Sequence, residues 1–501
     1  MKVVFILFDS LNRNALSCYN EAAPHTPNFD RLANRGTRFQ NHYVGSLPCM
    51  PARRDLLTGR LNFLHRSWGP VEPYDVCFPS LLRQRSVYTH LISDHYHYWE
   101  QGGCGYHNEY SSAEFVRGQE RDLWKAMVEP PTVRFREKYH RMLSDAARRF
   151  PNMVNREFIR DEAQFPIVQC VDLALEFLQL NHKADNWLLQ LELFDPHEPF
   201  TAPARFRKNL ATQYDGPVLD WPLYDKLQLS DAEADELRAN YLALVAMCDH
   251  YLGKLLDAMD DLALWQDTAI ILTTDHGFLL GEKSWWGKNR MPAWDPIAHI
   301  PLLLHHPHFS PGGSYQAQCL TQCLDVTTTL LDLFDVTPPA TMEGNSLLPA
   351  MTESCTVRDH ALFGIFGGAL NVTDGRHVYY RYPLDSDRAF YEYTLMPVHP
   401  ASYFTAGELE EATLARGFSF AQRMPLLRMP ARDDARRPPM QGGALAEANT
   451  VLYDLHSDPG QCAPLSDPAT EKRLADAMTA LMRNNEAPPE LFRRFDLTGF
   501  S

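Results

Sequence analysis

The segment CMPAR at positions 49–53 places a thiol, a proline and a guanidinium close together, and the turn-forming sequence TGR follows at positions 58–60. Pro51 suits the first turn of a helix, so Cys49 is expected near the positive end of that helix, where an anion can bind. A lone Cys-x-Pro is more often a buried structural cysteine. Here the spacing to Arg53 and the TGR sequence favour a cysteine that takes part in chemistry.

Two carboxylates and an imidazole follow apolar runs elsewhere in the chain. Asp9 ends the run that begins at Val3, and Asp275 and His276 follow a second run. Ligands bind at the carboxyl ends of parallel strands, so we expect these side chains at one edge of a sheet. Alone, a strand-end Asp is more often a turn or helix cap. Together the three residues predict a site for a hard divalent cation such as calcium or magnesium.

Short apolar runs that alternate with helical patterns must position these residues. They predict an α/β fold in which helices cover both faces of a sheet. The predicted strands are residues 3–8, 87–92, 187–193, 268–274 and 301–305. One helix is predicted between Pro27 and Gly36, and a longer one from Ser230 leads to the strand before Asp275.

The composition changes at residues 338–354, where Pro, Gly, Ser and Thr gather after a predicted helix at 324–334. We therefore predict a catalytic domain at residues 1–354 and a smaller C-terminal domain at 355–501. Residues 377–382 and 451–455 are predicted strands of that smaller domain. The segment 423–441 is rich in Arg, Pro and Met and is predicted to be a loop or an intersubunit arm, which leaves a homo-oligomer open.

The overall charge excludes some partners. The 501 residues include 47 Lys and Arg against 63 Asp and Glu, a net charge of -16 that would repel nucleic acid and anionic membranes. No apolar run reaches the length of a membrane span, and the short run at 3–8 lacks the features of a secretory signal. A cytoplasmic protein with neither kind of partner is expected. Its ten scattered cysteines are expected to be free thiols, most of them buried.

Six segments together resemble the type I, formylglycine-dependent sulfatases of the alkaline phosphatase-like superfamily. They are VVFILFDS and HTPNFDRLANRG near the start, CMPAR, FDPHEPF, TTDHG and GEKSWWGK. The resemblance extends from Asp9 to about Asp458, nearly the whole chain. It implies a large, mostly parallel sheet between helices, with a smaller C-terminal α+β domain that contains an antiparallel sheet.

The resemblance also implies a metal site. Asp9, Asp275 and His276 match the family's ligands, and the side chain at position 49 would complete the set around Ca²⁺, with Mg²⁺ or Mn²⁺ as alternatives. Many members have a second carboxylate or an amide where this chain has Ser10. A serine hydroxyl is a poor calcium ligand, so water or a bidentate Asp can replace direct ligation by Ser10.

The resemblance implies that Cys49 becomes Cα-formylglycine, made by a formylglycine-generating enzyme or an anaerobic maturase. One hydroxyl of the aldehyde hydrate then attacks sulfur and the second allows the aldehyde to reform as sulfate leaves. Arg53 matches the residue that holds the hydrate. Lys288 matches a lysine that binds the sulfate oxygens, although such side chains are usually solvated. His197 matches the histidine near the leaving-group oxygen, and either His197 or Lys288 would protonate that oxygen.

The segment SDHYHYW departs from the family pattern, which commonly reads Gly-Lys-Trp-His. His97 matches the histidine and would accept the proton of the second hydroxyl, whereas His95 occupies the lysine position and would bind substrate only while suitably protonated. A histidine-rich zinc tract is the alternative interpretation of this segment.

The leaving group is less defined by the sequence, and a sulfated sugar is preferred over an aryl sulfate. Seven polar or aromatic residues are candidates for the pocket wall or, equally, for packing: Arg66, Trp68, His95, Tyr96, Trp99, Arg117 and Gln119. Two other functions stay open. One is a phosphonate monoester or phosphodiester hydrolase that uses the same aldehyde and metal. The other is a silent member that binds sulfated glycans without cleaving them.

Overall fold

A large mixed sheet forms the centre of the molecule. The computed structural model describes residues 1–140, 146–309, 315–352, 355–383, 390–432 and 449–500. The strand order of the sheet is β12-β2-β11-β8-β1-β6-β4-β5. The bounds are β1 Lys2–Phe8, β2 Thr37–Tyr43, β4 Tyr88–Ser93, β5 Ser112–Phe115, β6 Trp187–Leu193, β8 Thr268–Thr274, β11 Leu302–His305 and β12 Tyr315–Gln322.

The sheet is mostly parallel, as predicted, with one exception. Strand β11 runs antiparallel to both of its neighbours, β2 and β8, and the other adjacent strands pair in parallel. All five strands predicted from apolar runs are present. Strands β2, β5 and β12 were not predicted because their sequences, TRFQNHY, SAEF and YQAQCLTQ, are too polar to stand out as buried runs.

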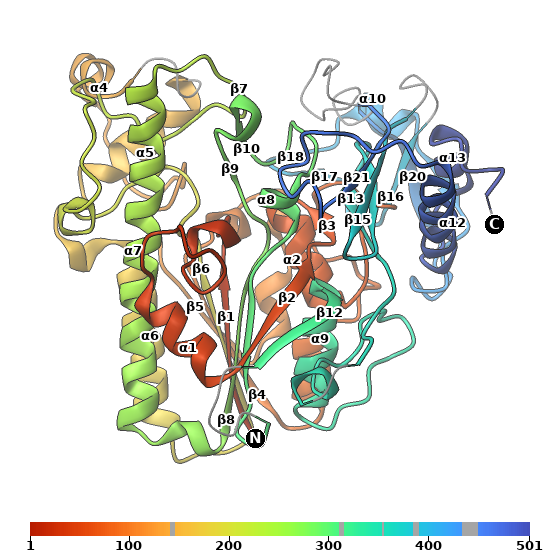
Figure 1. The fold of residues 1–501 in the computed structure, drawn as a ribbon, viewed down its shortest axis with the longest axis horizontal. Coiled ribbons are helices and arrows are strands. Elements are labelled where there is room, and N and C mark those ends of the chain that lie inside the picture. Colours follow the sequence, from red (N-terminus) through yellow and green to blue (C-terminus); the bar gives the residue numbers. More distant parts are fainter. Residues whose placement is uncertain (141–145, 310–314, 353–354, 384–389, 433–448, 501) are drawn as a thin grey trace.

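Alternate residues of β1 bury on opposite faces of the sheet. Val4 and Ile6 join the cluster made with α1, α6 and α7, whereas Val3 and Phe5 join the cluster made with α2, α3 and α9. The two helical layers lie on either side of the sheet in Figure 1. The bounds are α1 Pro27–Arg35, α2 Cys49–Thr58, α3 Phe78–Gln84, α6 Pro166–Asn181, α7 Asp231–Asp261 and α9 Cys323–Asp332. The predicted α/β class is confirmed.

Helix α7 begins where the sequence predicted. Ser230 caps it by accepting a hydrogen bond from Glu233 N, and the Glu233 carboxylate accepts one from Ser230 N in return. The chain then passes through a short connection into β8, which ends just before Asp275. The helix therefore leads into a strand at the centre of the sheet, beside β1.

A second sheet lies toward the C-terminus, with the order β21-β15-β14-β13-β3. Its bounds are β3 Ser46–Leu47, β13 Ala361–Ile365, β14 Leu370–Thr373, β15 His377–Arg381 and β21 Val451–Asp454. The last four strands pair antiparallel, and β3, just before Cys49, pairs parallel to β13. Helix α12 (Pro468–Asn484) covers this sheet (Figure 1).

The predicted division into domains at residues 354 and 355 stays a prediction, since 353–354 lie outside the described residues. The predicted loop at 423–441 is wrong for residues 426–430, which form β20 (Leu426–Pro430) between β16 (Tyr391–Thr394) and β19 (Thr413–Ala415). Backbone pairing with these two strands overrides the Arg and Pro content. Residues 433–441 lie outside the described part.

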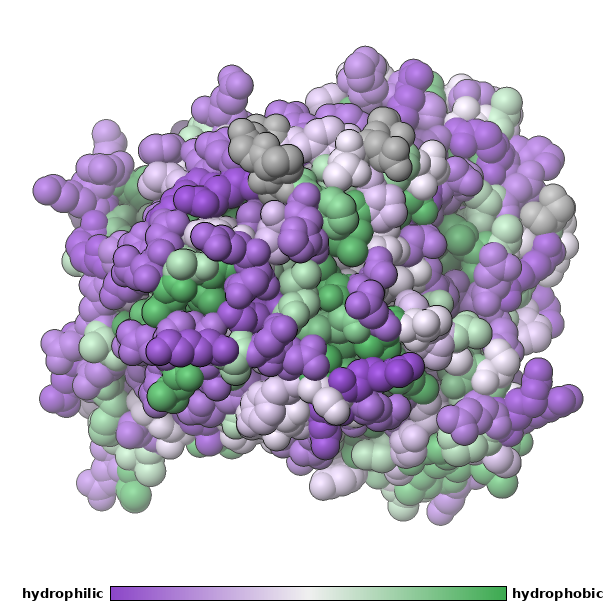
Figure 2. Space-filling view, turned by 90° about the horizontal axis from the view of Figure 1, so that it is seen from below, coloured by the Kyte–Doolittle hydropathy of each residue, from purple (hydrophilic) through white to green (hydrophobic). Residues whose placement is uncertain are grey.

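The remaining helices and strands have at most 11 residues. They are α4 Thr132–Lys138, α5 Ala146–Arg156, α8 Asp295–Ala298, α10 Ala406–Glu410, α13 Pro489–Arg494, β7 Asp225–Lys226, β9 Leu279–Leu280, β10 Trp285–Gly287, β17 Val398–His399 and β18 Ser402–Tyr403. Hydrophilic side chains cover most of the face shown in Figure 2. Within the described ranges, every helix is too short or too polar to cross a bilayer. All ten cysteines are free, as predicted, and five of them are buried.

Candidate active site

Cys49 is the first residue of α2 and its side chain is almost fully buried. Its Sγ lies 3.3 Å from His276 Nε2 and 3.3 Å from Lys288 Nζ. The thiol therefore stands at the N-terminal end of a helix, between an imidazole and an ammonium group. Burial, followed by the charge of Asp9, raises the pKa of the Cys49 thiol well above its ordinary value. The unmodified thiol stays protonated, so it is a weak nucleophile.

The residues around Cys49 hold α2 in place. Asp55 accepts hydrogen bonds from Ser46 N before the helix and from Asn62 N after it. Gly59 adopts a φ of 63° and its N–H bonds to Asp55 O, which terminates α2. A residue with a side chain is strained at that φ. The TGR sequence thus forms the end of the helix that carries Cys49.

Four side chains form a compact group of potential metal ligands at the ends of β1 and β8. One ligand atom from each of Asp9, Cys49, Asp275 and His276 lies within 4.8 Å of the others. Strands β1 and β8 are adjacent and parallel, so their carboxyl ends bring Asp9 and Asp275 together. Gly277 allows the next turn, because a Cβ at that position would lie 1.9 Å from Pro296 O.

His276 presents one nitrogen to this group. Its Nδ1 lies 3.0 Å from Gly277 O, and a carbonyl can only accept, so Nδ1 carries the proton and Nε2 keeps its lone pair. Burial, reinforced by Lys288, lowers the pKa of His276 to about 3, so the imidazole is neutral. Asp9 Oδ2 accepts no hydrogen bond, although Arg53 Nη2 lies 2.9 Å away. Two carboxylates and a neutral imidazole fit a hard divalent cation.

The charged side chains at the carboxyl ends of β1 and β8 form ion pairs, but the negative charges outnumber the positive ones. Arg53 contacts three carboxylates, with Nη2 at 2.9 Å from Asp9, Nη1 at 2.6 Å from Asp275 and Nε at 2.5 Å from Glu192. Lys288 adds one positive charge at 3.5 Å from Asp9 Oδ1. Burial acts to raise the pKa of Asp9, but Lys288 and Arg53 lower it well below its usual value. Three buried carboxylates against two cations leave an excess of negative charge that a metal ion would neutralise.

The pKa of Asp275 is shifted in the opposite direction from the pKa of Asp9. Burial and the charge of Asp9 raise the pKa of Asp275 to about 7, although Arg53 and Lys288 oppose the shift. A bound divalent cation would favour the ionised form of both carboxylates. These residues therefore fit a metal ion in two respects. Their carboxylate and imidazole atoms are suitable ligands, and their excess negative charge favours a bound cation.

Ser10 lies inside the cluster with a left-handed backbone, φ 62°. Its N–H donates to Asp275 Oδ1 at 3.0 Å, and its hydroxyl donates to Asp9 Oδ1 at 2.7 Å while accepting from Lys288 Nζ at 2.8 Å. The left-handed conformation is uncommon for serine and turns the chain so that both groups face the carboxylates. Direct ligation of a metal by Ser10 stays a prediction.

Lys288 follows strand β10 and is 3% exposed. The usual solvated lysine is therefore excluded at this position. Burial acts to lower the pKa of Lys288, but the neighbouring Cys49 and Asp9 raise it above its ordinary value, so the ammonium stays charged. A buried, permanently charged ammonium beside Cys49 can bind an anionic group there.

Two of the predicted histidines line the same cavity as Cys49 and Lys288, which measures about 470 Å³. His197 Nδ1 donates to Glu198 O at 2.6 Å, which leaves Nε2 as an acceptor. His97 Nδ1 lies 2.6 Å from Glu100 Oε2. Burial is the largest cause of a lowered pKa in both rings. Both imidazoles are thus neutral, and their lowered pKa makes each a weaker base than an exposed histidine.

His95 occupies a different position from the one predicted for substrate binding. It is fully buried, its Nδ1 lies 3.8 Å from Asp9 Oδ2, and neither ring nitrogen has a hydrogen-bond partner. It is absent from the cavity wall. Burial and Arg53 lower its pKa well below the ordinary value. The predicted substrate contact stays a prediction, and the structure places His95 behind the carboxylates instead.

Of the seven candidates for the pocket wall, only Trp68 lines the cavity within the described residues. Arg66 is buried in ion pairs with Glu72 and Glu392. Gln119 donates to Asp94 and Asp195. The packing alternative is therefore correct for these two residues.

Several acidic residues at the site were missed by the sequence analysis. Glu192, in β6, accepts from Arg53 and from Tyr98 OH. Glu100, Glu120 and Glu198 line the cavity. The signal for Glu192 was its carboxylate inside the apolar strand WLLQLEL, since a fully buried Glu needs a cationic partner. Glu120 lies in the charged run RGQERD, which carries no such signal.

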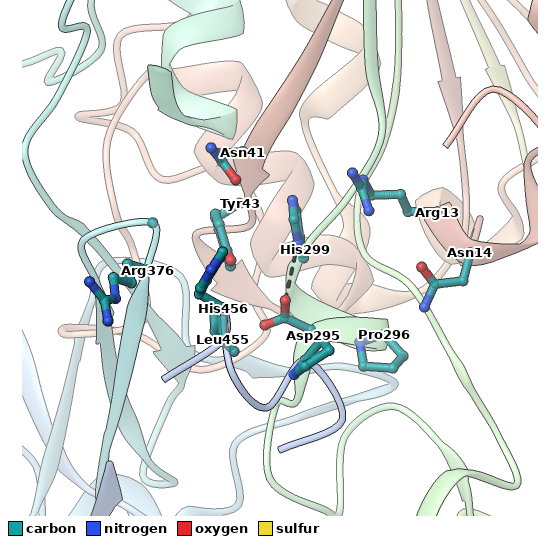
Figure 3. A pocket seen from close by; sticks show the side chains of 12 residues that line it. Arg13, Asn14, Asn41, Tyr43, Asp295, Pro296, His299, Arg376, Leu455 and His456 are labelled. Carbon is teal, nitrogen blue, oxygen red and sulfur yellow. Dashed lines mark hydrogen bonds and ion pairs between the residues drawn. The ribbon is translucent and has the colours of Figure 1, made fainter. Parts of the chain in front are cut away.

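A second hollow of about 560 Å³ lies between the η1 turn (Arg13–Ala15), β2, α8 and the turn between β14 and β15 (Figure 3). Asp295 and His299 form an ion pair at 3.1 Å, and the His299 ring stacks on Tyr43 with centroids 4.6 Å apart. Its wall includes no cysteine and none of the predicted metal ligands. The chemistry predicted from the sequence therefore belongs to the Cys49 cavity.

A family model for Sulfatase matches residues 2–336, more than half of the chain. The chain belongs to the sulfatase family. This sulfatase is similar to the choline-sulfatase of Rhizobium meliloti (strain 1021), with 25% identity over 426 residues that cover 77% of this chain and 79% of the relative. Membership confirms the predicted enzyme class, the sulfuric ester hydrolases.

Solved structures show the same fold at low identity. A protein in complex with its substrate D-glucosamine-2-N,6-O-disulfate superposes with a TM-score of 0.66 and 15% identity, covering 97% of this sulfatase and 98% of that chain. The phosphonate monoester hydrolase of Agrobacterium radiobacter gives 0.65 and 17%, covering 97% and 96%. These likenesses confirm the alkaline phosphatase-like fold predicted from the sequence.

Proposed function

We propose that this sulfatase hydrolyses sulfate monoesters of a sulfated saccharide or another small alcohol, and that Cys49 acts after conversion to Cα-formylglycine. The observation that carries the proposal is the position of Cys49 Sγ, 3.3 Å from both His276 Nε2 and Lys288 Nζ. The thiol marks the place of the aldehyde hydrate oxygens. The raised pKa of the thiol supports conversion, because the unmodified group is a weak nucleophile in this setting.

Asp9, Asp275 and His276 would hold a divalent metal, with Ca²⁺ proposed ahead of Mg²⁺ and Mn²⁺ because carboxylate oxygens dominate the donor set. The side chain at position 49 would complete the set, with Ser10, water or a bidentate Asp at the place where many family members carry a second carboxylate or an amide. When bound, the metal supplies a Lewis acid that favours ionisation of a hydroxyl at position 49 and offsets the charge of the sulfate group.

Lys288 and Arg53 have separate roles in this proposal. Lys288 binds the sulfate oxygens through a charged ammonium that faces position 49. Arg53 holds Asp9 and Asp275 in place and reduces the negative charge that an incoming sulfate must meet. With a divalent cation bound, the positive charge of the metal, Arg53 and Lys288 would exceed the negative charge of the three carboxylates, despite the net charge of -16.

Proton transfer falls to residues of the cavity wall. Either His197 or Lys288 is the proposed acid for the leaving-group oxygen, although the raised pKa of Lys288 makes it a weak acid that keeps its charge beside position 49. His197 presents an unprotonated Nε2, which accepts a hydrogen bond in the resting state. His97, neutral and supported by Glu100, accepts the proton released when the aldehyde reforms and sulfate leaves.

The similar proteins support the reaction class and leave the alcohol open. One relative is a choline-sulfatase, and one structural neighbour is described with a disulfated glucosamine as its substrate. Another neighbour is a phosphonate monoester hydrolase, which keeps that activity as the second candidate. A soluble sulfated saccharide remains the proposed substrate class.

The test uses full-length protein expressed with and without a formylglycine-generating enzyme. Intact mass gives the fraction of Cys49 converted, and turnover of nitrophenyl sulfate should rise in proportion to it. Cys49→Ala should be inactive, while Cys104→Ala, at an exposed cysteine, should behave as wild type. Full activity in protein with unmodified Cys49 would overturn the proposal. Faster turnover of a phenylphosphonate monoester than of the sulfate would establish the second candidate instead.

A further inference from the structure

The outer wall of the Cys49 cavity is rich in carboxylates. Five acidic residues line it: Glu100, Glu120, Glu198, Asp225 and Glu392. Two of the five are neutralised locally, since Asp225 pairs with Arg290 at 2.8 Å and Glu392 pairs with Arg66. Of the other three, Glu100 Oε2 lies 2.6 Å from His97 Nδ1, and Glu120 and Glu198 lack an ion pair of hydrogen-bonding length with a Lys or Arg of the described residues.

The cations near these three carboxylates are few. Arg121 is 3.9 Å from Glu120 and 3.8 Å from Glu100, too far for hydrogen bonds, and its Nε donates to Tyr96 OH instead. Arg432 also lines the cavity, and Lys288 is held by the Cys49 cluster. Lys288 also acts on the charges of Glu120 and Glu198, but within the described residues no Lys or Arg hydrogen-bonds to either carboxyl group.

Glu198 and Glu120 are both buried. Glu198 is 2% exposed, and its Oε2 has no hydrogen-bond partner while Oε1 accepts from Tyr224 OH. Burial raises the pKa of Glu120 to about 8, and the charge of Glu198 adds to the shift. Burial likewise raises the pKa of Glu198. A cation bound between them would favour both ionised forms.

Aromatic side chains complete this wall. Trp68 and Trp221 line the same cavity, and the Trp68 ring stands edge-on to His97 with centroids 4.6 Å apart. Tryptophan faces attract organic cations, and the attraction strengthens when water is excluded. Carboxylates and tryptophans together form a site for a positively charged nitrogen.

We propose that the alcohol released by this sulfatase carries a cationic nitrogen, held by Glu120 and Glu198 beside Trp68 and Trp221. The inference rests on the proposed sulfate-ester hydrolysis. The substrate would then be zwitterionic, with its sulfate at Lys288 and its cation at the outer carboxylates. A quaternary ammonium and a protonated amine share this chemistry, and the experiment separates them.

The experiment measures kcat/KM for two pairs of substrates with matured protein. Choline sulfate is compared with 3,3-dimethylbutyl sulfate, which has the same shape without the charge. Glucosamine 6-sulfate is compared with N-acetylglucosamine 6-sulfate. We expect the charged member of at least one pair to be preferred about 10- to 100-fold, the range of a desolvated charge pair. The pair that shows the preference identifies the kind of nitrogen.

Variants then assign the preference to a residue. Glu120→Gln should reduce it about tenfold or more by lowering kcat/KM for the charged ester, while the neutral ester reports that the protein still folds and turns over. Asp225→Asn is the matched control, because that carboxylate lines the same cavity but is paired with Arg290. It should leave the preference unchanged.

Equal turnover of charged and neutral esters in both pairs would overturn the inference and leave the proposed function intact. So would a preference that survives in Glu120→Gln. Absence of turnover for all four esters and for nitrophenyl sulfate, in protein shown to carry the aldehyde, would instead contradict the proposed function. The two failures are thus distinguishable.

Discussion

The distances between cationic and acidic side chains differ between the two ends of the Cys49 cavity. At the inner end, Arg53 contacts three carboxylates at 2.9 Å or less, and Lys288 donates to Ser10 and Cys49. At the outer wall, Arg121 stays 3.8 Å or more from Glu100 and Glu120. The inner end is organised before substrate arrives, as electrostatic catalysis requires. The proposed reaction and the proposed choice of alcohol therefore reside in different residues.

The largest effect is expected from the metal ligands of the inner end. Asp275→Asn, or treatment of matured protein with a chelator, should remove turnover below detection, and calcium should restore the chelated wild type only. Added calcium should also raise the Tm of unconverted wild-type protein but not that of Asp275→Asn, because binding to the folded state alone stabilises it. A calcium-dependent Tm shift that persists in Asp275→Asn would show that the ion binds elsewhere.

The second-largest loss of activity is expected from a substitution of Lys288. Lys288→Met removes the buried ammonium beside position 49 and is expected to lower kcat/KM for nitrophenyl sulfate about 10²- to 10³-fold. Lys283→Met is the control on the same segment, since Lys283 donates to Gln461 O and does not line the cavity. If both variants lose the same activity, the effect comes from folding and not from charge at the inner end.

A variant at His97 tests the second half of the proposed reaction, in which the aldehyde reforms and sulfate leaves. His97→Gln should lower the steady-state rate about 10²-fold, the usual contribution of a positioned base. A burst of nitrophenol followed by slow release of sulfate is expected, because the first step does not use His97. Stopped-flow absorbance and sulfate detection measure the two products, with the exposed His25→Gln as a control. Nitrophenol and sulfate released at one slow rate, without a burst, would assign His97 to the first step.

The smallest effect concerns stability at the outer wall. The pKa of Glu120, about 8, exceeds the value of about 4.3 for an unfolded glutamate. Between these values the folded carboxyl holds a proton that the unfolded one has lost, so the contribution of Glu120 to stability falls as pH rises. The Tm of Glu120→Gln relative to wild type should therefore increase from about pH 5 to about pH 8. The exposed Glu129→Gln should show no such trend; a constant Tm difference would remove Glu120 as the cause.

The sequence predicted the inner end far better than the outer wall. Asp9, Cys49 and Asp275 each belong to a local motif at a strand or helix end, and the order of strands then brings the motifs together. Glu120 and Glu198 come from two separate loops that both line the cavity, and only Glu198 lies in one of the quoted segments, FDPHEPF. No local pattern marks a carboxylate that becomes buried only when distant segments pack together.

The same reasoning applies to the fold. Strands with continuous apolar runs, such as β1 and β8, were predicted because both of their faces are buried. Strands β2 and β12 have interrupted patterns because they lie toward the edge of the sheet and expose alternate residues. The pairing of β3 with β13 is set by contacts between distant parts of the chain, which local sequence does not record.

That pairing also sets the order of events during synthesis. Ser46 and Leu47 align with Gly364 and Ile365, so the segment just before Cys49 cannot gain its partner strand until more than 300 further residues have left the ribosome. At the usual rate of elongation this takes roughly tens of seconds. During that time the CMPAR segment is not yet enclosed by the finished sheet. The late strand would thus give the proposed maturation enzyme an interval in which to reach Cys49 before the fold closes over it.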